Sequence, residues 1–140
     1  IKHCVLNDME LHREGLCTFA NEQAIREIYL KAFQAPCTPG ENDACANCVM
    51  GAFNLFGATW SGHHKGLWLE ILRGEWGYTG NITTDFGQNP SGYMEPQLAY
   101  EAGTTMFCTS GTALKTMPNF TVTCAKLLTA FSTTLQTVRP

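Results

Sequence analysis

The stretch 66-GLWLEILRGEWGYTGNITTDFG-87 decides the fold, because it passes from a helical pattern to a strand pattern across a glycine-rich turn. Apolar side chains first recur at helical spacing, at Leu67, Trp68, Ile71 and Leu72. Glycines then punctuate residues 74–80, and a β-prone run over residues 82–84 ends on the carboxylate of Asp85. A helix, a turn and a strand in this order predict one unit of an α/β fold.

The same alternation extends outward along the chain. Strands are predicted at about 2–6, 46–54, 82–85 and 104–107, and helices at about 21–34, 65–73, 95–102 and 119–138. The first helix begins after Asn21, a good capping residue, and its predicted apolar face comprises Ile25, Ile28, Tyr29, Ala32 and Phe33. Residues 7–20 and 55–63 are predicted to be loops. Successive βα units predict a parallel sheet or a TIM-type barrel, and four strands with four helices would form about half of one.

Composition narrows the function classes. The chain has 140 residues, enough for one domain, with 44% hydrophobic residues, 15% charged residues and a formal net charge of −3. A nucleic-acid-binding protein would show a basic stripe, so we expect no nucleic-acid partner. No apolar run approaches the roughly 20 residues that span a bilayer, so we expect no membrane segment. No signal peptide is visible. The chain opens on IKHCVLND without an initiator Met, and IKHC already resembles the end of a strand, so we expect the chain to begin inside a larger protein.

The seven cysteines favour free thiols, because their number is odd. This composition favours a cytoplasmic location, where thiols stay reduced. Cys45 and Cys48 form a CxxC motif that could be a redox pair or half of a zinc site. A zinc site needs about four ligands, and the neighbouring Cys37, His63 and His64 do not supply a second pair at matching spacing. We therefore expect buried thiols rather than a metal, and no cofactor.

Polar groups collect where the predicted strands end. Lys2 and His3 lie at the first strand, Asn54 at the second and Asp85 at the third. A carboxylate in this position has two readings, since Asp is a common turn and capping residue but also faces the active-site mouth when it ends a barrel strand. Bases and an acid on successive strand ends favour the second reading.

Five stretches resemble glycoside hydrolase family 3, in the order and spacing of that family. They are IKHCVLNDMELHR (1–13), NEQAIREIYLKAFQ (21–34), CVMGAFNLFGATWSG (48–62), GLWLEILRGEWGYTGNITTDFG (66–87) and MEPQLAYEAGTTMF (94–107). The resemblance extends from residue 1 to about residue 135. It implies that residues 1–140 are a single segment, the second half of the family's catalytic (β/α)8-type barrel domain. The family comprises β-glucosidases, β-xylosidases and relatives that remove a terminal β-linked sugar with retention of configuration.

The resemblance also implies roles for individual residues. Asp85 takes the position of the catalytic nucleophile, which forms a glycosyl-enzyme intermediate. Carbohydrate-binding positions are matched by Lys2, His3, Arg13, Met50 and Phe53. The general acid/base residue of the family lies in a downstream domain, so we expect it outside this chain. The isolated chain is then expected to be inactive and to associate with itself or with the remaining parts of its parent enzyme.

Two departures leave an alternative open. The family usually has Tyr where this chain has Phe53, and Trp where it has Phe86. Loss of the tyrosine hydroxyl could weaken catalysis, so the chain could instead belong to an inactive relative with a carbohydrate-binding or structural role. We expect His12, His63 and His64 to be solvated loop residues, with one of them as a candidate for the pocket mouth. We expect Trp60 and Trp76 to be packing residues, with Trp60 as a candidate to face the sugar-binding cleft.

Overall fold

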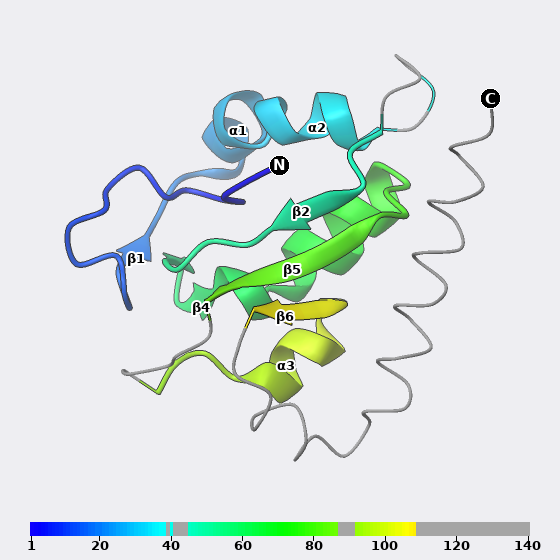
Figure 1. The fold of residues 1–140 in the computed structure, drawn as a ribbon. Coiled ribbons are helices and arrows are strands. Elements are labelled where there is room, and N and C mark those ends of the chain that lie inside the picture. The colour runs from blue at the N-terminus through cyan, green and yellow to red at the C-terminus, as the bar shows by residue number, and fades with distance from the viewer. Residues whose placement is uncertain (39, 41–44, 87–91, 109–140) are drawn as a thin grey trace.

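The computed structural model describes residues 1–38, 40, 45–86 and 92–108. Within these ranges the chain forms a mixed α/β structure with two small sheets (Figure 1). The predicted helix at 119–138 lies outside the described residues.

The larger sheet is parallel and has the order β2-β5-β6, formed by Cys48–Met50, Asn81–Phe86 and Met106–Cys108. All three strands lie within or next to predicted strand ranges. The predicted strand at 2–6 is reduced to a single parallel bridge between Cys4 and Gly51, with the Cys4 N–H donating to the Met50 carbonyl at 2.8 Å. The N-terminal segment nevertheless extends this sheet beside β2. The parallel arrangement confirms the α/β class, while the half barrel stays a prediction.

The smaller sheet was not predicted. It consists of β1 (Cys17–Thr18), β3 (Leu55–Phe56) and β4 (Thr59–Trp60), in the order β1-β3-β4. The prediction of loops at 7–20 and 55–63 is therefore wrong at these short strands. Strands of two residues leave no alternating pattern in the sequence, because their stability comes from pairing with a distant segment.

The first helical segment lies beyond the β2 edge of the sheet in Figure 1 and comprises α1 (Glu22–Ala24), η1 (Ile25–Tyr29) and α2 (Lys31–Cys37). The Asn21 side chain caps it, accepting from the Ala24 N–H at 2.8 Å. The prediction of its apolar face is partly wrong, since Ile28 is 66% exposed and Leu30 is buried instead. The cause is the π-helical turn of η1, in which the Leu30 N–H donates to the Ile25 carbonyl and shifts the later residues around the helix axis.

The core lies between this sheet and its helices. The helix η3 (Gly66–Glu75) follows the short 3-10 turn η2 (Ser61–His63), and it lies behind the sheet in Figure 1. Its Leu67, Trp68 and Leu72 pack with Val49 and Ile82 in one fully buried cluster. The helix α3 (Pro96–Glu101) leads into β6 and contributes Ala99 to a second cluster with Phe53, Trp60 and Met94. The predicted burial of Trp60 and Trp76 is confirmed.

Candidate functional site

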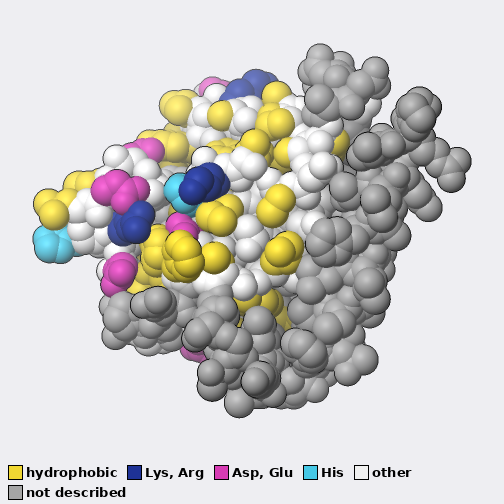
Figure 2. Space-filling view, in the orientation of Figure 1, with side chains coloured by type: hydrophobic (Ala, Val, Ile, Leu, Met, Phe, Trp, Pro, Cys, Tyr) yellow, Lys and Arg dark blue, Asp and Glu magenta, His cyan; other side chains and the backbone are white. Residues whose placement is uncertain are grey.

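Asp85 lies near the C-terminal end of β5, on the sheet face opposite the main core. The Asp85 side chain contacts His3 and lies outside the helix-covered cluster, and the pairing of β5 with β6 is irregular between Thr83 and Phe86. Thr83 is paired with Met50 of β2 and with Met106 of β6, whereas Ile82 points into the helix-covered core. Figure 2 shows that acidic, basic and histidine side chains lie together among apolar ones on the face that Figure 1 presents. The third strand therefore ends as its sequence pattern predicted.

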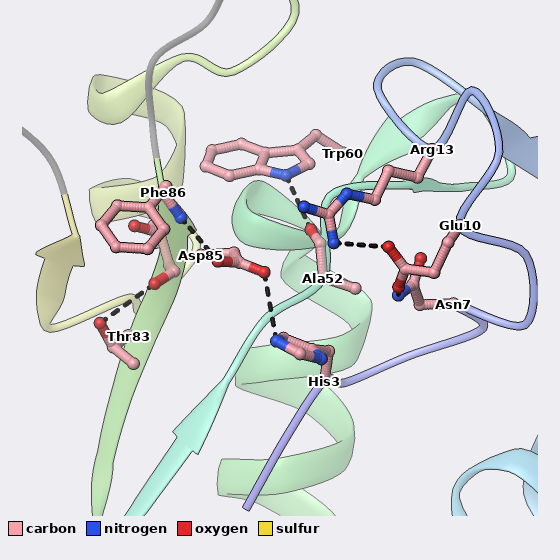
Figure 3. Close-up of polar contacts among 10 residues, drawn as sticks. His3, Asn7, Glu10, Arg13, Ala52, Trp60, Thr83, Asp85 and Phe86 are labelled. Atoms are coloured by element: carbon pink, nitrogen blue, oxygen red, sulfur yellow. Dashed lines mark hydrogen bonds and ion pairs between the residues drawn. The ribbon is translucent and has the colours of Figure 1, made fainter.

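The Asp85 carboxylate has two polar partners, one for each oxygen. Its Oδ2 atom lies 3.3 Å from His3 Nε2, and its Oδ1 atom accepts a hydrogen bond from the Phe86 N–H at 2.8 Å. Asp85 is only 6% exposed, while the His3 side chain is 27% exposed. The two side chains point toward each other in Figure 3. The carboxylate is thus held in one orientation and remains reachable at the edge of the sheet.

The segment that carries Lys2 and His3 is tied to β2 by the backbone. The Ile1 nitrogen donates to the Cys48 carbonyl at 2.7 Å, and the Met50 N–H donates to the Ile1 carbonyl at 2.9 Å. These bonds bring His3 next to the end of β5. The Lys2 side chain is exposed and Met50 is half-buried.

Arg13 and Phe53 form a second contact at the site. The Arg13 guanidinium carbon lies 4.3 Å from the centroid of the Phe53 ring, which is 8% exposed. A guanidinium over an aromatic face is an attractive cation–π arrangement. The same guanidinium donates through Nη1 to Glu10 Oε2 at 2.7 Å. Of the six residues predicted for the site, the structure gives direct contacts to His3 with Asp85 and to Arg13 with Phe53.

Aromatic side chains pack beside these contacts. Trp60 donates from Nε1 to the Ala52 carbonyl at 2.9 Å and meets the Tyr93 ring edge to face, with centroids 6.4 Å apart. The Tyr93 hydroxyl donates to the Phe53 carbonyl at 2.9 Å. Phe86, which follows the carboxylate directly, is 61% exposed. Exposed and half-buried aromatic faces beside a carboxylate can stack on the apolar face of a sugar.

Sequence reasoning missed Tyr93 and Glu10 as members of this site. Asn7, Glu10 and Arg13 recur at intervals of three, a spacing that allows side-chain pairing in a turn and that could have signalled the contact. No comparable signal marks Tyr93, because the residue it binds is 40 positions away.

The histidines after β4 differ from the prediction. Both His63 and His64 are partly buried rather than solvated, and burial lowers the pKa of each imidazole. His64 stacks on Phe56 with ring centroids 4.4 Å apart, and its Nδ1 atom accepts from the Leu67 N–H at 3.1 Å. The imidazole of His64 therefore caps the start of η3. His12, in contrast, is exposed as predicted.

The thiols of the CxxC motif lie in a half-buried environment. Burial raises the pKa of Cys45 and of Cys48, which favours the neutral thiol over the thiolate that binds metals. The described part of the chain contains no group of three or more His, Cys, Asp or Glu side chains arranged to hold a metal ion. Among the same residues, no helix combines the length and apolar character that crossing a bilayer requires.

No family model matches the chain. Among curated proteins, β-glucosidase BoGH3A of Bacteroides ovatus is 40% identical over 87 residues, which cover 62% of this chain and 11% of that enzyme. β-Glucosidase A of Butyrivibrio fibrisolvens is 39% identical over 85 residues, which cover 61% of the chain and 10% of the enzyme. The chain thus spans about a tenth of the length of these relatives.

Solved structures agree with the sequence matches. β-Glucosidase 3B of Thermotoga neapolitana superposes with a TM-score of 0.67 and 25% identity, over 94% of this chain and 17% of that one. The β-glucosidase of Kluyveromyces marxianus gives a TM-score of 0.66 and 30% identity, over 76% of this chain and 12% of that one. The family resemblance read from the motifs is confirmed. The chain is therefore similar to one segment of the β-glucosidases of glycoside hydrolase family 3.

Proposed function

We propose that this chain carries the nucleophile and part of the sugar-binding subsite of a retaining β-glucosidase. The observation that carries the proposal is the Asp85 carboxylate, 6% exposed at the end of a parallel strand, with one oxygen bound by the Phe86 N–H and the other 3.3 Å from His3. A buried carboxylate that is held in one orientation by neighbouring polar groups is suited to covalent catalysis. The relatives named β-glucosidases support a terminal β-linked glucoside as substrate.

In the proposed reaction, Asp85 attacks the anomeric carbon while the glycosidic bond to the leaving alcohol breaks. A general acid protonates the glycosidic oxygen as this bond breaks, so the leaving group departs as an alcohol, and the resulting carboxylate then takes a proton from the water that hydrolyses the glycosyl ester. Two inversions at one carbon give net retention. Retaining enzymes hold the two carboxyl groups about 5 Å apart, so the second carboxyl must approach Asp85 closely. We place it outside this chain.

The neighbours of Asp85 suit recognition of the sugar. Lys2, His3 and Arg13 can donate hydrogen bonds to sugar hydroxyls, which act as acceptors in a partly desolvated site. Met50 is half-buried and pairs with Thr83, two residues before Asp85, so it can supply an apolar wall. The Phe53 ring lies under the Arg13 guanidinium and supplies a second wall.

The chain would perform this reaction only as part of a longer protein, called the parent protein below. We propose that the parallel sheet β2-β5-β6 and its helices belong to the second half of a TIM-type barrel that other segments complete. The sheet face that carries Asp85 also bears Met106, which is 38% exposed, and an apolar group on this face suits packing against those segments. We expect the isolated chain to be inactive and to associate with itself or with the rest of the parent protein.

A second candidate is a carbohydrate-binding protein without hydrolytic activity. Phe53 favours it, because a phenyl ring offers no hydroxyl to the nucleophile or to the substrate. Binding requires the donors around Asp85 but does not require a nucleophile, so substitution of Asp85 separates the two functions.

The test uses the parent protein with an aryl β-D-glucoside as substrate. We expect Asp85→Asn to lower kcat by roughly a thousandfold or more, as removal of a covalent nucleophile does in other enzymes. Asp85→Gly with added azide should restore turnover and yield an α-glucosyl azide, because the anion attacks once and inverts the anomeric carbon. Glu101→Gln is the control, since this exposed carboxylate accepts from Gln97 on α3.

Equal rates for the wild-type parent and Asp85→Asn would refute the assignment of the nucleophile. Binding of D-glucose without any hydrolysis by the wild-type parent would favour the carbohydrate-binding protein.

A further inference from the structure

The Arg13 side chain is restrained more strongly than its position on a loop suggests. Its side chain is 35% exposed, yet a carboxylate and an aromatic ring both contact the guanidinium. Glu10 Oε2 accepts from Nη1 at 2.7 Å, and the Phe53 ring lies beneath at 4.3 Å. An unrestrained arginine samples many rotamers, so two contacts from different directions select one orientation.

Glu10 is itself held in place. Its second carboxylate oxygen, Oε1, accepts a hydrogen bond from Asn7 Nδ2 at 2.8 Å. The backbone supports the same arrangement, because the Arg13 N–H donates to the Glu10 carbonyl at 3.3 Å and closes a turn. Figure 3 shows Asn7, Glu10 and Arg13 in a row beside the Asp85–His3 pair. Both oxygens of Glu10 are therefore used to orient groups on this loop.

Tyr93 fixes the other contact of Arg13. Its hydroxyl donates to the Phe53 carbonyl at 2.9 Å, which holds the backbone that carries the Phe53 ring. Burial raises the pKa of the Tyr93 phenol, and a hydrogen bond from the Gly15 backbone acts in the opposite direction. Gly15 is two residues after Arg13, so one hydroxyl connects the arginine loop with the segment after β2.

We propose that Glu10 and Tyr93 are positioning residues that hold the Arg13 guanidinium against the Phe53 ring, so that its remaining N–H groups face the sugar attacked by Asp85. Arginine has five N–H donors, and the contact with Glu10 leaves most of them for a ligand. This inference rests on the proposed function. We expect that removing the contact made by Glu10 or by Tyr93 weakens sugar binding and leaves the chemical step unchanged.

The test measures KM and kcat for an aryl β-D-glucoside, and the dissociation constant of D-glucose by titration calorimetry, in the parent protein. Glu10→Gln and Tyr93→Phe should each raise KM and the glucose dissociation constant by about two- to fivefold with kcat nearly unchanged, as expected for the loss of an exposed ion pair or one hydrogen bond. A general structural defect would instead lower kcat through a smaller active fraction.

A double-mutant cycle shows whether Glu10 acts through Arg13. In an Arg13→Met background, Glu10→Gln should have no further effect, because the guanidinium it orients is gone. The matched control is Glu22→Gln, which removes an exposed carboxylate that pairs with Arg26 at 2.9 Å on the first helical segment. This control should leave KM, kcat and the glucose dissociation constant at wild-type values.

Each outcome decides the inference. An unchanged KM in Glu10→Gln, or an equal loss in the Arg13→Met background, would overturn the positioning role while leaving the proposed hydrolysis intact. If the wild-type parent binds D-glucose without hydrolysing the glucoside, the proposed reaction is wrong. The positioning role is then tested by measuring the glucose dissociation constant for the same double-mutant cycle. A wild-type parent that neither hydrolyses nor binds would overturn both.

Discussion

The Asn54 side chain joins three segments around the site, and its removal gives a sharp test of the structure. Asn54 is fully buried, and its Nδ2 atom donates to the Val5 carbonyl at 3.1 Å and to Thr18 Oγ1 at 2.9 Å. It thereby connects the segment that carries His3 with β1 and with the hairpin of β3 and β4. We expect Asn54→Ala to weaken all three at once.

The magnitude follows from the bonds that are lost. Two hydrogen bonds contribute about 1 kcal/mol each, and leaving the buried Val5 carbonyl without a partner adds about 1–3 kcal/mol. Asn54 Oδ1 is buried and has no partner within the described residues, so removing this atom is favourable and offsets part of the destabilisation. We expect the free energy of unfolding to fall by about 2–4 kcal/mol in Asn54→Ala. Asn54→Asp should cost more, because a carboxylate cannot donate to either acceptor.

Urea unfolding of the parent protein, followed by tryptophan fluorescence, measures this loss. Trp60, Trp68 and Trp76 are all buried, so they report on the region around Asn54. Gln23→Ala is the control, since it removes an exposed amide bound to Glu27 at 3.3 Å and should change stability by less than about 0.5 kcal/mol. The reasoning would be refuted if Asn54→Ala lowered the free energy of unfolding by less than about 0.5 kcal/mol. It would also be refuted if Asn54→Asp were less destabilising than Asn54→Ala.

Two further predictions concern titration and thiol reactivity. Burial lowers the pKa of His64 below 6.5, so the unfolded chain binds its proton first and stability falls as the pH drops below about 6.5. His64→Asn keeps an acceptor for the Leu67 N–H without titrating and should reduce the slope of urea midpoint against pH; an unchanged slope would contradict this. Iodoacetamide should label the exposed Cys17 before the fully buried Cys4 and Cys37, because burial also raises the pKa of both buried thiols. Peptide mapping by mass spectrometry gives the order, and earlier labelling of Cys37 would refute the burial described for it.

The elements that sequence predicted correctly are those with a strong local pattern. Helix η3 and strand β5 follow directly from the periodicity of residues 66–87. The short strands β1, β3 and β4 carry no such pattern, because they exist only through pairing such as Cys17 with Leu55. The exposed Ile28 was mispredicted for a related reason, since it lies inside a π-helical turn that brings Leu30, rather than Ile28, back to the side of Ile25.

The sequence by itself determined the order of the main helices and of the strands β2, β5 and β6, the position of Asp85 at a strand end and the family that the chain resembles. These features depend on residue types and spacing within one segment, because neighbouring residues alone set the preference for a helix or a strand. Only the tertiary structure decided that His3 meets Asp85, that Phe53 lies under Arg13 and that Tyr93 binds the Phe53 backbone. Those contacts join residues far apart in the chain, and the packing of sheet and loops, rather than any local preference, brings them within bonding distance.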